Sequence, residues 1–135
     1  MALYLSKPGI MSCAGNNIEE LWESVTSGNQ TLIKKVTACT GEDFYAARVS
    51  DSNLKATKAR YDMRIIRIEE AAINQLTNEI NTAISRYGSE RLAVCVGSCD
   101  NGTEFSLAGH RKFFAEEKFP QEYNIEMQGA DYVAT

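Results

Sequence analysis

The sequence predicts a mixed α/β fold in which residues 1–135 form one domain with an incomplete sheet. A chain of 135 residues suits a single domain. Residues 61–87 carry apolar side chains at every third or fourth position, a spacing typical of a long amphipathic helix. Residues 91–96 form a continuous apolar run, typical of a strand buried on both faces of a parallel sheet. Because such a strand needs neighbours, more chain or another subunit must complete the sheet.

The composition excludes several classes of protein. Apolar residues make up 44% of the chain and charged residues 24%, which are globular values and argue against disorder or a coiled coil. Fourteen basic residues face eighteen acidic ones without a basic stripe, so we expect no nucleic-acid partner. No apolar run approaches the length of a membrane span, and the first ten residues do not resemble a signal peptide. We therefore expect a cytoplasmic protein.

The first elements are a strand and a capped helix. A short strand is expected at residues 2–5, before a proline-glycine pair interrupts the chain. A helix over residues 18–27 follows, because Asn17 is a favourable N-cap and Glu20, three positions later, completes the capping-box pattern. Gly28 supplies the stop.

The next segment carries few structural patterns. Residues 29–60 are expected to be mostly irregular, with one short extended piece at 44–49. Their basic residues are dispersed among acidic and small polar ones, which favours a solvated surface over a phosphate site. These residues are Lys34, Lys35, Lys55, Lys58 and Arg60.

The second half should alternate helix, strand and helix. The broad apolar stripe of the predicted helix 61–87 should be well buried, in a core or at a subunit interface, and Gly88 ends it. The strand at 91–96 runs into a glycine-rich turn, at the edge of the sheet where ligands gather in open α/β folds. A further helix begins at Thr103 or Ser106 and runs to about Lys118.

No catalytic, cofactor-binding or metal-binding residues are predicted from the motifs. The glycines at 97 and 102 fit neither a dinucleotide fingerprint nor a P-loop. A triad of Ser98, His110 and Asp131 lacks a GxSxG elbow, and His110 is expected at or near the surface. The cysteines have no CxxC spacing and should be reduced, mostly buried thiols. They are Cys13, Cys39, Cys95 and Cys99.

The order of motifs nevertheless resembles a known family. Residues 9–16 read GIMSCAGN, and residues 18–23 read IEELWE. They resemble the opening of the β-ketoacyl-acyl-carrier-protein synthases, in which a first strand leads to a G-(I/V)-x-S-x-x-G-N turn and an E-E-x-W helix. The likeness continues through a short F-x-x-x-x-(V/I) segment, the long helix, the V-C-V-G-S strand end, and the last four residues. The resemblance covers essentially the whole chain and rests on the order and spacing of these motifs taken together.

The resemblance implies the N-terminal portion of a thiolase-like fold, in which helices and sheets are layered α/β/α/β/α. It also implies that the nucleophilic cysteine and the catalytic histidines come after Thr135. None of the four cysteines matches the position of the nucleophile, and His110 does not match the position of either catalytic histidine. Residues 1–135 would then be scaffold, and the complete protein would be an acyltransferase. It would catalyse decarboxylative Claisen condensation of acyl and malonyl thioesters, with acyl carrier protein as partner, as a homodimer or heterodimer without a cofactor.

Two departures from the family pattern bear on the substrate. Residues 6–9 read SKPG where the family has T-G-x-G. Asp100 and Asn101 stand where the family is glycine-rich near its acyl-chain pocket, and they are the expected substrate-pocket residues. Because a carboxylate facing an alkyl chain is costly unless paired, Asp100 either points elsewhere or leaves polyketide or polyene synthesis open beside fatty-acid synthesis.

Two alternatives stand beside the active synthase. The chain could belong to a non-catalytic partner subunit of such a synthase, similar to a chain-length factor. It could also be an unrelated small α/β binding module that folds alone. The synthase and its partner subunit predict an exposed apolar helix face and association with other polypeptide. The binding module predicts a stable monomer with two-state unfolding.

Overall fold

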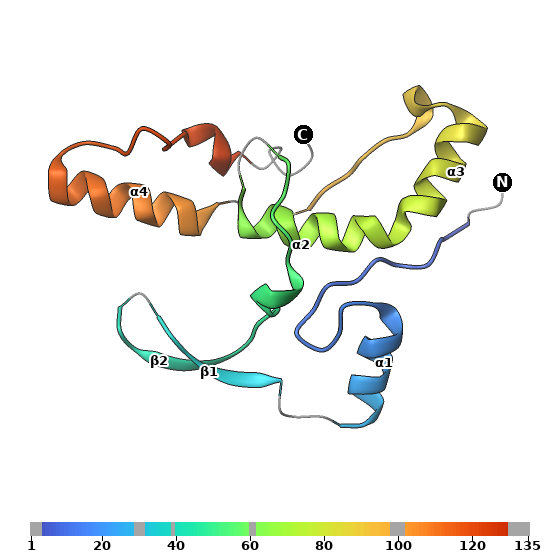
Figure 1. Cartoon of the computed structure of the whole chain (residues 1–135), viewed down its shortest axis with the longest axis horizontal. Coiled ribbons are helices and arrows are strands. Elements are labelled where there is room, and N and C mark those ends of the chain that lie inside the picture. The colour runs from blue at the N-terminus through green and yellow to red at the C-terminus, as the bar shows by residue number, and fades with distance from the viewer. Residues whose placement is uncertain (1–3, 29–31, 39, 60–61, 98–101, 130–135) are drawn as a thin grey trace.

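A computed structural model describes residues 4–28, 32–38, 40–59, 62–97 and 102–129. These ranges hold helices and one antiparallel pair of strands, which confirms the mixed α/β class but not a layered or parallel sheet. The order is α1 (Ile18–Thr26), β1 (Ile33–Thr37), β2 (Asp43–Ala47), α2 (Arg64–Ile73), α3 (Thr77–Tyr87) and α4 (Thr103–Glu116) (Figure 1).

The N-terminus of α1 is capped as its sequence predicts. The side chain of Asn17 accepts a hydrogen bond from the Glu20 amide at 2.8 Å. The Glu20 carboxylate in turn accepts from the Asn16 amide at 2.8 Å, one residue earlier than in a standard capping box. Gly28 follows the helix with a φ of 66°. The helix expected at 18–27 is therefore confirmed to within one residue.

The strand expected at residues 2–5 is wrong where the structure describes it. Tyr4 and Leu5 have no regular structure and are 90% and 99% exposed. An isolated extended segment has no backbone partner, so its apolar side chains alone do not create a strand.

Residues 29–60, expected to be mostly irregular, instead contain a β-hairpin. β1 and β2 pair antiparallel, with Ile33 opposite Ala47 and Thr37 opposite Asp43. The extended piece expected at 44–49 is confirmed in part as β2. Both faces of the hairpin are largely exposed, so its sequence lacks the alternation by which strands are recognised.

The long helix predicted at 61–87 is confirmed from Arg64 to Tyr87, with a 3₁₀ turn over Asn74–Leu76 between α2 and α3. Figure 1 shows the axis bending at this point. The helix is buried only in part within this chain: Ile66 lies in the core, whereas Ile73, Ile80, Ile84 and Tyr87 are between 36% and 47% exposed. Burial of this stripe at a subunit interface stays a prediction. Within the described ranges no other helix or strand covers this face. A core that excludes water would need such a cover.

The strand expected at 91–96 is also wrong in this chain. A 3₁₀ turn occupies Ser89–Arg91, and the following residues to Gly97 have no regular structure. Val94 is 74% exposed. The segment has no neighbouring strand among the described residues, and a parallel strand gains its hydrogen bonds only from neighbours.

The last predicted helix is confirmed as α4, which begins at Thr103 rather than Ser106. Glu117 follows it in a left-handed conformation, with a φ of 55°, and Pro120 lies just beyond. The chain then forms a 3₁₀ turn over Ile125–Gln128. The last four residues, which carry part of the resemblance, lie outside the described residues.

The hydrophobic core is small for a chain of this size. Among the described residues the buried apolar side chains are Met63, Ile66 and Met127, with Ile65 packed against them. The chain exposes 10571 Å² of surface, whereas a compact monomer of 15.0 kDa exposes about 7,000 Å². This excess agrees with an apolar face that other polypeptide would cover. No helix in the described ranges is long and apolar enough to cross a membrane.

Candidate functional site

The turn at residues 9–15 holds itself together through Ser12. The Ser12 hydroxyl accepts hydrogen bonds from the amides of Ala14 and Gly15, both at 3.1 Å. The Ser12 amide donates to the Gly15 carbonyl at 2.9 Å and closes the loop. The serine of the GIMSCAGN sequence therefore has a local structural role.

Gln75 fastens this turn to the long helix. Its Nε2 donates to the carbonyls of Ile10 and Asn16, both at 2.8 Å, and its Oε1 accepts from the Ile10 amide at 3.2 Å. Gln75 lies in the 3₁₀ turn between α2 and α3. One side chain thus satisfies three backbone groups more than fifty residues away in sequence.

Two glycines of the turn lie against backbone. A Cβ on Gly9 would overlap the carbonyl oxygen of Ala72, and one on Gly15 would lie 2.7 Å from the carbonyl carbon of Glu20. Because the obstructing atoms are main chain, they cannot rotate away. Both positions therefore require glycine for a steric reason.

A groove of about 430 Å³ lies beside the docked turn, and we call it the turn–helix groove. Its walls come from the turn, from α2 and from the end of the 92–97 segment. The lining residues are Gly9, Ile10, Met11, Ile65, Ile68, Glu69, Ala72, Val96 and Gly97. The groove is mainly apolar, and its one ionisable side chain is Glu69.

The Glu69 carboxylate is partly desolvated. Burial raises the pKa of Glu69 above its ordinary value, and within the described part of the chain no hydrogen-bond donor approaches the carboxylate. An unpaired carboxylate in an apolar wall can gain free energy by accepting a hydrogen bond from a cation or another donor.

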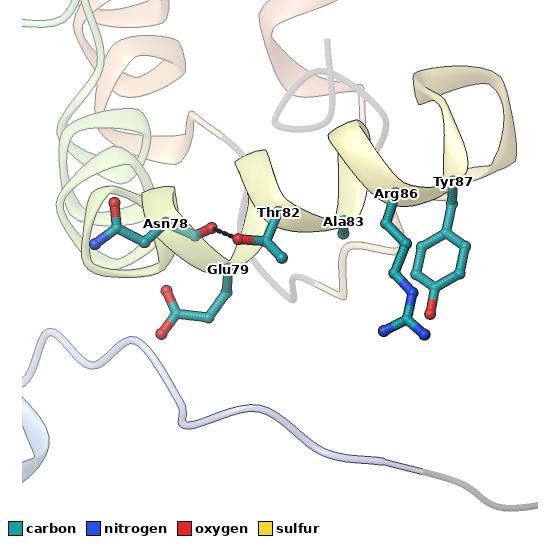
Figure 2. Close-up of a pocket in the computed structure, with 6 residues that line it drawn as sticks. All are labelled: Asn78, Glu79, Thr82, Ala83, Arg86 and Tyr87. Atoms are coloured by element: carbon teal, nitrogen blue, oxygen red, sulfur yellow. Dashed lines mark hydrogen bonds between the residues drawn. The ribbon is translucent and has the colours of Figure 1, made fainter.

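A second hollow, of about 380 Å³, lies along α3 and is shown in Figure 2. Thr82 Oγ1 donates to the Asn78 carbonyl at 2.7 Å, and the Arg86 guanidinium lies 5.3 Å from the centre of the Tyr87 ring. Lys7 Nζ lies 3.6 Å from Glu79 Oε1 and ties the N-terminal segment to the helix. The side chains that line the hollow come from one face of α3 and do not converge on a common point. The hollow therefore suggests no reaction.

The start of α2 is joined to the segment that follows the hairpin. Arg64 Nε lies 2.7 Å from Asp51 Oδ1, and Arg64 Nη2 donates to the Val49 carbonyl at 2.7 Å. Arg48 Nη2 lies 3.2 Å from the other oxygen of Asp51. The hydrogen bond from Arg64, with the nearby positive charges, holds the pKa of Asp51 below its ordinary value.

The Asp51–Arg64 contact should weaken at acidic pH. The pKa of Asp51 is lower in the folded chain than in the unfolded chain. The Asp51–Arg64 contact therefore stabilises the fold at pH values above the unfolded pKa, and this stabilisation is lost as pH falls through the folded pKa. We expect the contact to loosen as pH falls below the ordinary value of 3.8 and through the lower pKa of the folded state. NMR titration of the Asp51 side-chain carboxyl carbon measures this directly, and a midpoint at or above the ordinary value of 3.8 contradicts it.

The residues predicted from sequence are not brought together in the described structure. Asp100, Asn101, Cys39 and Cys99 lie outside the described residues, as do Ser98 and Asp131. Cys13 is a half-buried free thiol, whereas Cys95 is exposed, so the expectation of mostly buried thiols is wrong at Cys95. The described ranges hold no cluster of side chains that could bind a metal ion.

His110 lies at the surface, as predicted. Its Nδ1 lies 2.8 Å from the Ser106 carbonyl, one turn earlier in α4. Its ring meets Phe119 and Tyr123 edge-to-face, with ring centres 5.5 and 5.7 Å away. Phe119 also stacks on Phe113 at 4.6 Å. The histidine therefore packs in a small aromatic cluster that closes the end of α4.

Sequence reasoning missed Gln75 and Glu69. Each is a polar residue beside the apolar stripe of a helix, Gln75 just before Leu76 and Glu69 just after Ile68. Such a position is the one feature that could have drawn attention to them, because a polar side chain near a buried face needs a partner.

Comparison with protein-family models, curated proteins and solved structures finds no match for this chain.

Proposed function

We propose that this chain is the N-terminal scaffold of a 3-oxoacyl-[acyl-carrier-protein] synthase. One observation supports the proposal most: the GIMSCAGN turn is fastened to the long helix by Gln75, with Gly9 against the helix backbone. The turn and the helix are two of the segments on which the resemblance rests. A steric need for glycine at positions 9 and 15 accounts for their place in that motif.

The scaffold role follows from what the docked turn supports. The turn, α2 and the end of the 92–97 segment form one unit around the turn–helix groove. In the proposed synthase, that segment leads to Asp100 and Asn101 at the substrate pocket. Its position would then be set by the contacts of Gln75 and Gly9, so these residues would act on the pocket through the backbone.

The chemistry itself would fall to residues after Thr135. A cysteine at a helix N-terminus, where the thiol pKa is lowered, would accept an acyl group from an acyl-carrier-protein thioester. Loss of carbon dioxide from malonyl carrier protein would give a carbanion that attacks the acyl enzyme, with backbone amides holding the oxyanion. The product is a 3-oxoacyl thioester of either the fatty-acid or the polyketide type.

The partner-subunit alternative shares all of these observations. The large exposed surface and the exposed apolar face of α3 fit a subunit that packs on an active synthase as well as they fit an active one. The two differ only in whether a nucleophilic cysteine follows.

The test begins with the coding sequence read past Thr135. If the frame continues, the longer product is purified and supplied with acyl and malonyl carrier protein. The expected result is carbon dioxide release together with a 3-oxoacyl product, both abolished by prior thiol alkylation. An altered chain length in the product of an active synthase, with no condensation by the longer polypeptide alone, would favour the partner subunit. Absence of condensation by the longer polypeptide alone, together with an unchanged product of the active synthase, contradicts the proposal.

A further inference from the structure

The segment Leu92–Gly97 presents the features of a strand without a partner. Leu92 has an extended backbone, and the side chains of Leu92, Val94 and Val96 are 40%, 74% and 38% exposed. Within the described ranges, the amides and carbonyls from Ala93 to Gly97 make no backbone hydrogen bond. Figure 1 shows the segment running from the 3₁₀ turn after α3 toward α2. Unpaired extended backbone is what a β-strand of another polypeptide binds.

A second and independent feature lies at the end of this segment. Val96 and Gly97 form one wall of the turn–helix groove, and Glu69 lies in the same groove. Ile65, Ile68 and Ala72 of α2 form an apolar part of the same lining. The partly desolvated carboxylate of Glu69 has no donor among the described residues. The groove therefore combines an apolar lining with one carboxylate that has no donor among the described residues.

We infer that a β-strand of a partner protein pairs with Leu92–Gly97 and places a lysine side chain in the turn–helix groove against Glu69. The strand backbone would supply the hydrogen bonds that the segment lacks. The four methylenes of lysine would lie along the apolar wall, and its ammonium group would donate to the carboxylate. The chain itself carries a net charge of −4, which also favours a basic partner segment.

This partner strand is specified by its chemistry and does not depend on condensing activity. A glutamate or a purely apolar residue at the same position would leave Glu69 repelled or unpaired. An amine without a peptide backbone would satisfy Glu69 but leave the Ala93–Gly97 amides open.

The first test uses a capped synthetic peptide, Ser-Val-Lys-Val-Thr-Val-Ser, and its counterpart with glutamate in place of lysine. Hydrogen exchange at the Ala93–Gly97 amides is followed by NMR at about millimolar peptide, a range that detects weak binding. We expect the lysine peptide to slow this exchange about tenfold and the glutamate peptide to have no effect, since a factor of ten requires about 1.4 kcal/mol. Equal protection by both peptides, or by neither, overturns the inference.

The second test changes the protein. Glu69→Gln keeps the size of the side chain, and Glu23→Gln on the exposed face of α1 is the matched control. We expect Glu69→Gln to weaken the lysine peptide roughly 2- to 5-fold, as loss of a half-exposed ion pair predicts, and Glu23→Gln to leave affinity unchanged. Circular dichroism checks that both variants keep the helix content. Unaltered affinity in a folded Glu69→Gln variant overturns the role of Glu69.

Discussion

Replacing Gly9 with alanine is expected to release the GIMSCAGN turn from the long helix. The new Cβ would overlap the Ala72 carbonyl oxygen, and Leu76 Cγ would lie only 3.3 Å away. Since the first obstacle is helix backbone, the turn must move, at a cost of about 2–3 kcal/mol for such overpacking. The Ile10 amide reports the change, because it donates to Gln75 in the docked turn. Its hydrogen exchange should accelerate by a factor of about 30 or more.

Gly97→Ala is the matched control for this substitution. Gly97 has no heavy atom within 4 Å of the position a Cβ would take, and its φ is not in the left-handed region. The control should leave exchange at Ile10 unchanged within a factor of about 2. Slow exchange at Ile10 in Gly9→Ala, equal to that of the unaltered protein, would contradict the close packing of the turn on α2.

Replacing Gln75 with methionine is expected to have an effect of similar size. The change removes hydrogen bonds to the Ile10 amide, the Ile10 carbonyl and the Asn16 carbonyl, all of which are partly buried. Leaving a buried polar group unsatisfied costs about 1–3 kcal/mol. Exchange at Ile10 should therefore rise roughly 5- to 150-fold while the length and helix propensity of the side chain are kept.

The control for Gln75→Met is Gln121→Met, which changes an exposed glutamine between α4 and the last 3₁₀ turn. It should leave the turn at residues 9–15 unaffected. If the two methionine variants show the same exchange at Ile10, Gln75 does not fasten the turn.

The elements that could be predicted from sequence are those whose cause is local. α1 begins where Asn17 and Glu20 cap it, and both partners lie within four residues of each other. The helix over residues 64–87 follows from apolar spacing along one stretch of chain. The 3₁₀ turn within it could not be predicted, because it coincides with Gln75 reaching a turn that precedes it by some sixty residues.

The strands show the opposite case. The Leu92–Gly97 segment has a strand-like sequence but no strand beside it in the described ranges, and hydrogen bonds to a neighbour are what define a strand. β1 and β2 have a neighbour in each other, joined through the Ala38 amide and the Glu42 carbonyl at 2.7 Å. Because both faces of these strands are exposed, their sequences lack the alternation of apolar and polar residues that indicates a strand. Gly41, in a left-handed conformation, marks the turn between them.

The candidate site was only partly accessible from sequence for a related reason. The GIMSCAGN turn could be picked out as a motif, and the structure gives its serine and glycines steric and hydrogen-bonding roles. Glu69 and Gln75 could not, because their roles arise from segments that fold against them from far along the chain. Asp100 and Asn101 remain a prediction.

The most direct measurement is the association state and unfolding of residues 1–135 as an isolated chain, by analytical ultracentrifugation and calorimetry. A scaffold that other polypeptide must cover should associate when isolated, and the chain exposes 10571 Å² and buries few apolar side chains. We expect species heavier than 15.0 kDa at micromolar concentration and a broad, weakly cooperative unfolding transition. A monodisperse monomer of 15.0 kDa with one sharp two-state transition would contradict it and favour a binding module that folds alone.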